Sequence, residues 1–163
     1  MIKQDFEQIY MDSKKNVWSL VSRYVFFQQD REDLLQEVFI NVHKALSKFR
    51  GESSINTWIY KITVNTAINY VNKQNRFKTL KRALSGLRII EEESLQVSSD
   101  INELKPLAKL NPQQRMILLL SDIEEKKLDE IAEMMRLPIG TVKSNLHRAR
   151  EIVKKEVIEN GGL

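Results

Sequence analysis

The sequence of 163 residues contains no cysteine, which excludes a disulfide framework, a thiolate metal site and a cysteine nucleophile. With only five glycines and three prolines, collagen-like, low-complexity and turn-rich all-β classes are disfavoured. The longest purely apolar runs, such as residues 116–120, are too short to span a bilayer, and the first residues lack the apolar core of a signal peptide. We therefore expect a globular cytoplasmic protein with no direct membrane insertion.

The residues that are abundant predict an all-α fold in two parts. Apolar residues make up 42% of the chain and recur at spacings of three and four, which is typical of amphipathic helices. The net charge of +4 permits a polyanionic partner. Residues 91–93 are three glutamates in a stretch with only scattered apolar residues. We expect two small helical domains, 1–82 and 104–163, joined by a flexible linker over 83–103; the alternative is a solvated helix within one domain.

A helix-turn-helix is predicted in the second part. Residues 128–135 and 141–150 have helical spacing, and a break at residues 136–140 separates them. The first segment is acidic, whereas residues 141–155 contain five basic residues and one acidic residue. A basic second helix suits entry into a phosphate-lined groove. The alternative is a structural helical hairpin. Upstream, Asn111 and Gln114 form a predicted capping box in front of a deeply buried helix.

The predicted helix over residues 33–46 carries one apolar residue on its polar face. Ile40 is ringed there by Gln36, Glu37 and Asn41. An apolar anchor with a polar rim is typical of protein–protein interfaces. The alternative is that a single exposed apolar residue has no meaning.

A second helix, predicted over residues 57–72, carries a narrow polar line that we call the amide strip. On a helical wheel, Lys61, Asn65, Asn69 and Asn72 line up, with Trp58 at the head of the strip. Amides suit base edges, and an aromatic ring can stack on an unpaired base. Residues 73–82 add five basic residues and no acidic one, which resembles a phosphate-binding border. The alternative is an ordinary amide-rich surface with Trp58 in the core.

No catalytic, cofactor or metal site is expected. The two histidines, His43 and His147, lack metal-ligand spacing, and the sequence contains no glycine-rich phosphate loop or nucleophile motif. We therefore expect a protein that is not an enzyme.

Taken together, these segments resemble bacterial sigma factors of the sigma-70 family, in the extracytoplasmic-function group. The likeness in the first part rests on DLLQEVFI at residues 33–40, FRGES at 49–53, TWIYKI at 57–62 and VNTA at 64–67. In the second part it rests on LPIGTVKS at residues 137–144 and HRAR at 147–150. The two motifs are independent and occur in the order that the family has.

The resemblance implies a subunit that directs core RNA polymerase to promoters. It implies docking on the clamp of the largest polymerase subunit through Asp33, Gln36, Glu37, Ile40 and Asn41. It implies melting and single-stranded recognition of the −10 element by Gly51, Ser53, Ser54, Asn56, Trp58, Lys61, Asn65, Asn69, Lys73 and Arg76. It implies duplex recognition of the −35 element by Thr141, Lys143, Ser144, His147, Arg148 and Arg150, with the second domain near the β flap. An anti-sigma factor, which in this group is often tethered at the inner membrane face, is a further implied partner.

Two positions depart from the family pattern. Arg136 stands where glycine is common at the end of the first helix, and we expect it to adopt a left-handed conformation or to change the turn. Asn145 replaces a common arginine and removes a possible phosphate contact. Two other readings remain open: a helix-turn-helix regulator that is not a polymerase subunit, and a helical adaptor that binds only protein. Neither the Ile40 anchor nor the amide strip has a purpose in a duplex-binding repressor, and the basic helix argues against the adaptor.

Overall fold

The first half of the chain folds into three long helices. The structure is a computed structural model that describes residues 5–85 and 105–161. Helix α1 spans Phe6–Tyr24, α2 spans Gln28–Ala45 and α3 spans Ile55–Ser85, with a short 3-10 helix, η1, at Leu46–Lys48. The three long helices contact one another in pairs. Their shared core includes Leu20, Leu34, Val38, Ile59 and Val64, all at most 2% exposed.

The second half contains two short helices, a π-helical turn and one long helix. Helix α4 spans Pro112–Leu118 and continues as the π-helical turn η3 at Leu119–Ile123. Helix α5 spans Leu128–Met135 and α6 spans Ile139–Glu159. Asn111 and Gln114 cap α4 with the predicted capping box, and residues 116–120 are buried as expected. No strand occurs in the parts of the chain that the structure describes, so the all-α prediction is confirmed for them.

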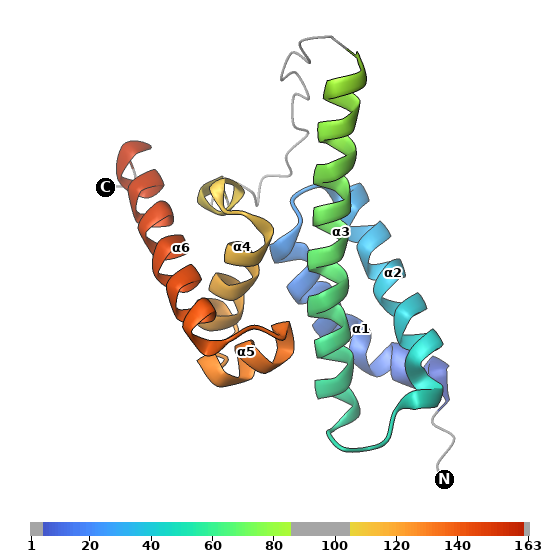
Figure 1. Ribbon diagram of the computed structural model, residues 1–163. Coiled ribbons are helices and arrows are strands. Elements are labelled where there is room, and N and C mark those ends of the chain that lie inside the picture. Colours follow the sequence, from blue (N-terminus) through green and yellow to red (C-terminus); the bar gives the residue numbers. More distant parts are fainter. Residues whose placement is uncertain (1–4, 86–104, 162–163) are drawn as a thin grey trace.

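Helix α3 is longer than predicted. It extends past the expected end at residue 72 to Ser85 and therefore includes the basic run and the first three residues of the expected linker. The remainder of the expected linker lies outside the described residues. The end of α3 projects well beyond α1 and α2 (Figure 1). Helix α2 begins at Gln28, five residues before the expected start. Its first turns include the buried Arg31, whose Nε donates to the Val25 carbonyl oxygen at 3.0 Å.

The two halves pack against each other, and their apolar residues form one continuous core cluster. Helix α3 contacts both α4 and α5. The sequence predicted two small helical domains joined by a flexible linker, and no motif in it indicated that the domains pack against each other. The packing determines which of the candidate DNA-binding residues reach the surface.

Candidate nucleic-acid interface

Part of the amide strip lies between the two halves instead of facing open solvent. The Asn65 side-chain amide donates to the Lys61 carbonyl oxygen at 2.8 Å and to the Met134 carbonyl oxygen at 3.1 Å. The Lys61 ammonium forms an ion pair with the Glu133 carboxylate. Met134 and Glu133 belong to α5, so the first helix of the helix-turn-helix covers this part of the strip.

The rest of the strip borders a cavity of about 450 Å³. Asn65, Asn69 and Asn72 line it from α3, whereas Asn111, Pro112 and Gln113 line it from the start of α4. Asn69 is exposed and Asn72 half-buried. The strip is thus neither inside the three-helix core nor freely accessible. We call this arrangement, with α5 seated on Lys61 and Asn65, the closed arrangement.

Trp58 is half-buried at the head of the strip. Its ring packs at 5.1 Å from that of Phe49 and against the core, which leaves only part of the indole at the surface. The loop before it is set by Gly51, whose φ of 72° lies in the left-handed region, and by Ser54. The Thr57 backbone amide donates to the Ser54 hydroxyl oxygen at 3.1 Å, so Ser54 caps α3.

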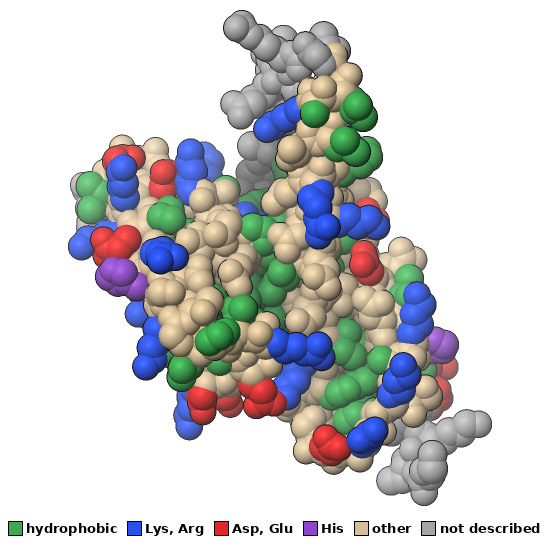
Figure 2. Space-filling view, in the orientation of Figure 1, with side chains coloured by type: hydrophobic (Ala, Val, Ile, Leu, Met, Phe, Trp, Pro, Cys, Tyr) green, Lys and Arg blue, Asp and Glu red, His purple; other side chains and the backbone are tan. Residues whose placement is uncertain are grey.

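The other predicted −10 residues fall into two places. Asn56 lines a separate cavity of about 300 Å³ beside α1 and Glu124, on a different side of α3 from the strip. Ser53 is half-buried in the loop. Lys73 and Arg76 are exposed near the projecting end of α3, where basic side chains gather (Figure 2). The structure therefore brings Lys61, Asn65 and Asn69 together, and separates Asn56 from them.

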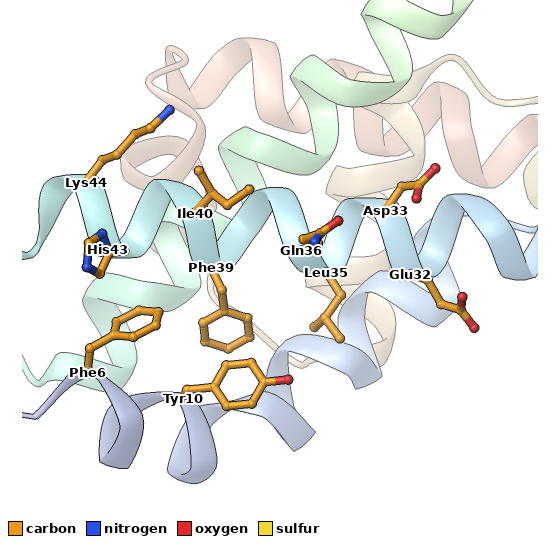
Figure 3. Close-up of a pocket in the computed structure, with 10 residues that line it drawn as sticks. All are labelled: Phe6, Tyr10, Glu32, Asp33, Leu35, Gln36, Phe39, Ile40, His43 and Lys44. Atoms are coloured by element: carbon orange, nitrogen blue, oxygen red, sulfur yellow. The ribbon is translucent and has the colours of Figure 1, made fainter.

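The face of α2 that carries Ile40 is open. Ile40 is 46% exposed, and it lies with Asp33 and Gln36 at the edge of a groove of about 640 Å³ between α1 and α2. Phe39 and Leu35 point into this groove toward Phe6 and Tyr10, whereas Ile40, at the edge of the groove, points away from these two rings (Figure 3).

Two members of the predicted docking set lie outside that groove. Glu37 is half-buried beside it. Asn41 points toward α3, where its side-chain amide donates to the Thr66 hydroxyl at 3.2 Å. A polar side chain that bridges two helices in this way has a structural role in addition to any docking role.

The helix-turn-helix presents a basic outer face. Lys143, His147 and Arg148 are exposed on α6, and Val142, Leu146 and Ala149 are buried beneath them. Thr141 and Ser144 are half-buried, with the Ser144 hydroxyl donating to the Thr141 carbonyl oxygen at 3.1 Å. Arg136 adopts the left-handed conformation, with φ 53° and ψ 45°. This confirms the first of the two outcomes that the sequence predicted for this position.

Arg150 already has a protein partner. Its guanidinium forms two hydrogen bonds with the Asp122 carboxylate, at 3.1 Å and 2.6 Å. These bonds lower the pKa of Asp122. A bidentate pair of this kind fixes the orientation of the guanidinium. Asn145 is buried, and its amide donates to the Thr141 carbonyl oxygen at 2.8 Å, so it faces the domain interior.

Arg115, which the sequence reasoning missed, joins the two halves. It is 8% exposed and donates to three carbonyl oxygens: Leu107 at 3.1 Å, Leu110 at 3.3 Å and Tyr24 at 3.1 Å. Its guanidinium also lies 4.6 Å from the centre of the Phe26 ring. Burial lowers the pKa of Arg115 from its ordinary value, and the group satisfies its charge with backbone oxygens instead of a carboxylate. An arginine directly before an apolar run was the only signal in the sequence.

Two further contacts join the same faces. The Tyr24 hydroxyl donates to the Pro112 carbonyl oxygen at 3.0 Å, and Arg23 pairs with Glu124 at 2.8 Å. The buried arginine and tyrosine form the centre of the contact, whereas the ion pairs of Arg23 and Lys61 are more exposed to solvent. Exposed pairs contribute little free energy, so the centre holds the halves together.

Within the described ranges, 5–85 and 105–161, no helix has the length and apolar character that a bilayer crossing requires. The same residues contain no cluster of three or more metal-ligating side chains.

Comparison with protein-family models finds two matches. Residues 9–77 match the model "Sigma-70 region 2", and residues 105–153 match "Sigma-70, region 4". Together the two models cover most of the chain, in the order that the sequence motifs predicted.

Curated proteins give the same result. The chain is 33% identical to the ECF RNA polymerase sigma-E factor of Escherichia coli K12, over 93% of this chain and 86% of that protein. It is 30% identical to the RNA polymerase sigma-H factor of Pseudomonas aeruginosa, over 94% of this chain and 86% of that protein.

Two solved structures share the fold. One is the sigma factor RpoE in complex with the anti-sigma factor NepR from Bartonella quintana, with a TM-score of 0.70 and 19% identity over 93% of this chain and 96% of that chain. The other is CnrH in complex with the cytosolic domain of CnrY, with a TM-score of 0.65 and 18% identity over 94% of this chain and 88% of that chain.

Proposed function

Because the chain belongs to the extracytoplasmic-function group of sigma-70 factors, and is thus an RNA polymerase sigma factor, we propose how its surfaces divide the work of initiation. The first unit, residues 1–82, docks on the polymerase and holds the opened −10 element. The second unit, residues 104–163, reads the duplex −35 element, and 83–103 links them. The chain carries out no catalysis of its own and works in the cytoplasm, where its polymerase is. The observation that carries the proposal is the basic face of α6, which the closed arrangement leaves uncovered.

The polymerase docks on the α2 face around Ile40. An exposed isoleucine beside Asp33 and Gln36, at the rim of an apolar groove, has the composition of an interface anchor (Figure 3). Glu37 and Asn41 flank this anchor on the same helix. The clamp of the largest polymerase subunit is the proposed partner of this face.

The amide strip captures unpaired −10 bases. A flipped base loses a few kcal/mol of stacking, which hydrogen bonds and ring contacts in its pocket must offset. Asn65 and Asn69 supply amide donors and acceptors, the exposed part of Trp58 supplies a ring face, and Lys61 supplies a cation. The loop residues Gly51, Ser53 and Ser54 border the base, and Lys73 and Arg76 contact the backbone. Asn56, which lines the separate cavity beside α1, is not part of this pocket.

The closed arrangement and −10 binding use the same groups. The Glu133 carboxylate pairs with the Lys61 ammonium, which a DNA phosphate would otherwise contact. The Met134 carbonyl oxygen accepts a hydrogen bond from the Asn65 amide, which is then not available to a base. We infer that α5 leaves α3 before the strip engages DNA. The free protein is then a closed form, and the polymerase-bound form is an open one.

The outer face of α6 reads the −35 element. Lys143, His147 and Arg148 make the base and phosphate contacts, with Thr141 and Ser144 at the start of the helix. Arg150, held by Asp122, contacts a phosphate at the edge of the site or stabilises the helix that carries the readers. The β flap of the polymerase supports this half.

An anti-sigma factor holds the chain inactive. Two of the solved structures that share this fold are complexes with the anti-sigma factor NepR and with the cytosolic domain of CnrY, which supports a partner of the same kind here. If that partner is membrane-tethered, it holds this chain at the inner membrane face.

Transcription with purified core polymerase on a randomised promoter library tests the proposed function. We expect transcripts whose templates share two elements separated by a constant spacing. If the protein binds duplex DNA and leaves core polymerase inactive, it acts as a helix-turn-helix regulator instead.

A further inference from the structure

The projecting end of α3 carries an apolar line that nothing in the described chain covers. Tyr70 is the last buried residue of α3, and its hydroxyl donates to the Asp30 carboxylate of α2 at 3.0 Å. From residue 75 to residue 85, every residue of the helix is exposed. We call these eleven residues the overhang. Figure 2 shows apolar side chains interleaved with lysine and arginine there.

The apolar residues of the overhang form a single seam. Phe77, Leu80 and Leu84 are 64%, 56% and 78% exposed. Their spacing of three and then four residues places them on one narrow side of the helix, in the a, d, a pattern of a coiled coil. The seam continues the side of α3 that packs on α2 through Tyr70. Three large apolar side chains in a line on a bare helix are typical of a docking surface.

The charges beside the seam select its partner. Arg76 and Lys81 occupy the g and e positions that flank Phe77 and Leu80, and residues 73–85 include no acidic side chain. In a parallel pair of two copies of this chain, Arg76 would face Lys81 of the other copy; in an antiparallel pair, like residues would face each other. Both arrangements oppose equal charges, so a second copy of this chain is disfavoured. A helix with acidic e and g positions complements the seam.

We propose that the overhang binds an acidic amphipathic helix of another protein through Phe77, Leu80 and Leu84. Promoter phosphates would satisfy the basic residues but leave the apolar seam in water. A membrane surface would favour a wider apolar face than one line of three side chains. Only an apolar helix with carboxylates along its edges satisfies both features. The proposal does not depend on the promoter contacts assigned above.

A designed peptide tests the seam on the full-length chain. The probe is a fluorescent peptide of about 21 residues with leucine at a and d and glutamate at e and g. The reference peptide carries lysine at e and g. Fluorescence anisotropy should show the glutamate peptide binding at least about tenfold more tightly than the lysine peptide. Combining Phe77→Ser, Leu80→Ser and Leu84→Ser should abolish that binding.

Two further variants make the test specific. Ile158→Ser, at a 68% exposed apolar residue of α6, is the matched control and should bind as the unchanged chain does. The pair Arg76→Glu and Lys81→Glu should reverse the preference between the peptides. Circular dichroism and thermal melting establish that each variant remains folded.

Four results would overturn the proposal. The first is equal binding of both peptides, and the second is binding that survives the seam variant. The third is seam-dependent binding to phosphatidylglycerol vesicles with neither peptide bound, which would assign the overhang to a membrane surface. The fourth is a seam-dependent dimer in sedimentation, which would assign it to a second copy.

Discussion

At the residue scale, Arg115 is a charged side chain that is buried, whereas Ile40 is an apolar side chain that is exposed. Arg115 is a buried cation that donates to three carbonyl oxygens and lies over an aromatic ring, so its charge is satisfied within the contact between the halves. Ile40 is an apolar side chain left in water. The sequence revealed Ile40, because its position on a helical wheel depends only on its near neighbours. It concealed the role of Arg115, because Arg115 and Tyr24 lie far apart in the sequence.

Ile40→Asp should abolish binding to core polymerase. Truncating an interface anchor typically costs at least about 2 kcal/mol, and a buried unpaired carboxylate adds to that cost. The position is 46% exposed, so the fold should persist. Co-purification with core polymerase is the measurement, and Met11→Asp, at a 67% exposed residue of α1, is the control. If the Ile40 variant co-purifies with core polymerase as the unchanged chain does, the proposal that α2 carries the docking face is contradicted.

Arg148→Ala should weaken binding to the duplex −35 element by about 1–3 kcal/mol if the guanidinium reads a base. Lys154→Ala, a change of the same charge further along α6, is the comparison and should act mainly through salt dependence. The measurement is binding to the cognate element and to single-base variants of it. A loss of the same size on every sequence would show that Arg148 contacts only phosphate.

At the scale of the element, the sequence predicted which segments are helical better than where they end. The polar and apolar periodicity of α3 is clear through residue 72, and the sequence contains no proline or glycine between residue 72 and Ser85. The overhang is helical although no other part of the described chain covers it. A helix end predicted from the pattern of buried residues therefore falls too early in the sequence. The capping box of α4 was predictable because it depends on two residues three apart.

The turn of the helix-turn-helix gives a stability prediction. Arg136 has φ 53° in the left-handed region, where a side chain costs roughly 1 kcal/mol relative to glycine. Arg136→Gly should therefore raise the free energy of unfolding by up to about 1 kcal/mol in urea denaturation. Arg136→Ala keeps the Cβ and should give no such gain. Equal effects of the two variants would mean that the side chain, and not the backbone conformation, sets the energy here.

At the scale of the whole molecule, the packing of the two halves covers part of the amide strip, the surface that we propose binds the −10 bases. The sequence predicted the amide strip as one face of a helix, but it did not predict that α5 covers part of that strip. Whether Glu133 meets Lys61 depends on how two separate units dock, and no local pattern in either unit encodes that. The uncovered face of α6, by contrast, follows from the apolar and basic periodicity of one helix.

Glu133→Ala should raise the affinity of the free chain for a single-stranded −10 oligonucleotide by up to about fivefold. An exposed ion pair contributes at most about 1 kcal/mol, and the variant releases Lys61 from it. Asp129→Ala removes the same charge from α5 at an exposed residue that has no bond to α3, and it should have less effect. Equal gains in affinity for the two variants would indicate a general effect of charge. That result would contradict the proposed competition between Glu133 and DNA for Lys61.

The most direct test measures the distance between the two halves before and after polymerase binds. The chain has no cysteine, so Lys15→Cys on α1 and Lys155→Cys on α6, both at exposed positions, can carry a donor and an acceptor dye. Energy transfer should be high in the free protein and should fall when core polymerase and promoter DNA are added, as α5 leaves the amide strip. Transfer that stays high while transcripts are made would contradict the opening of the closed arrangement.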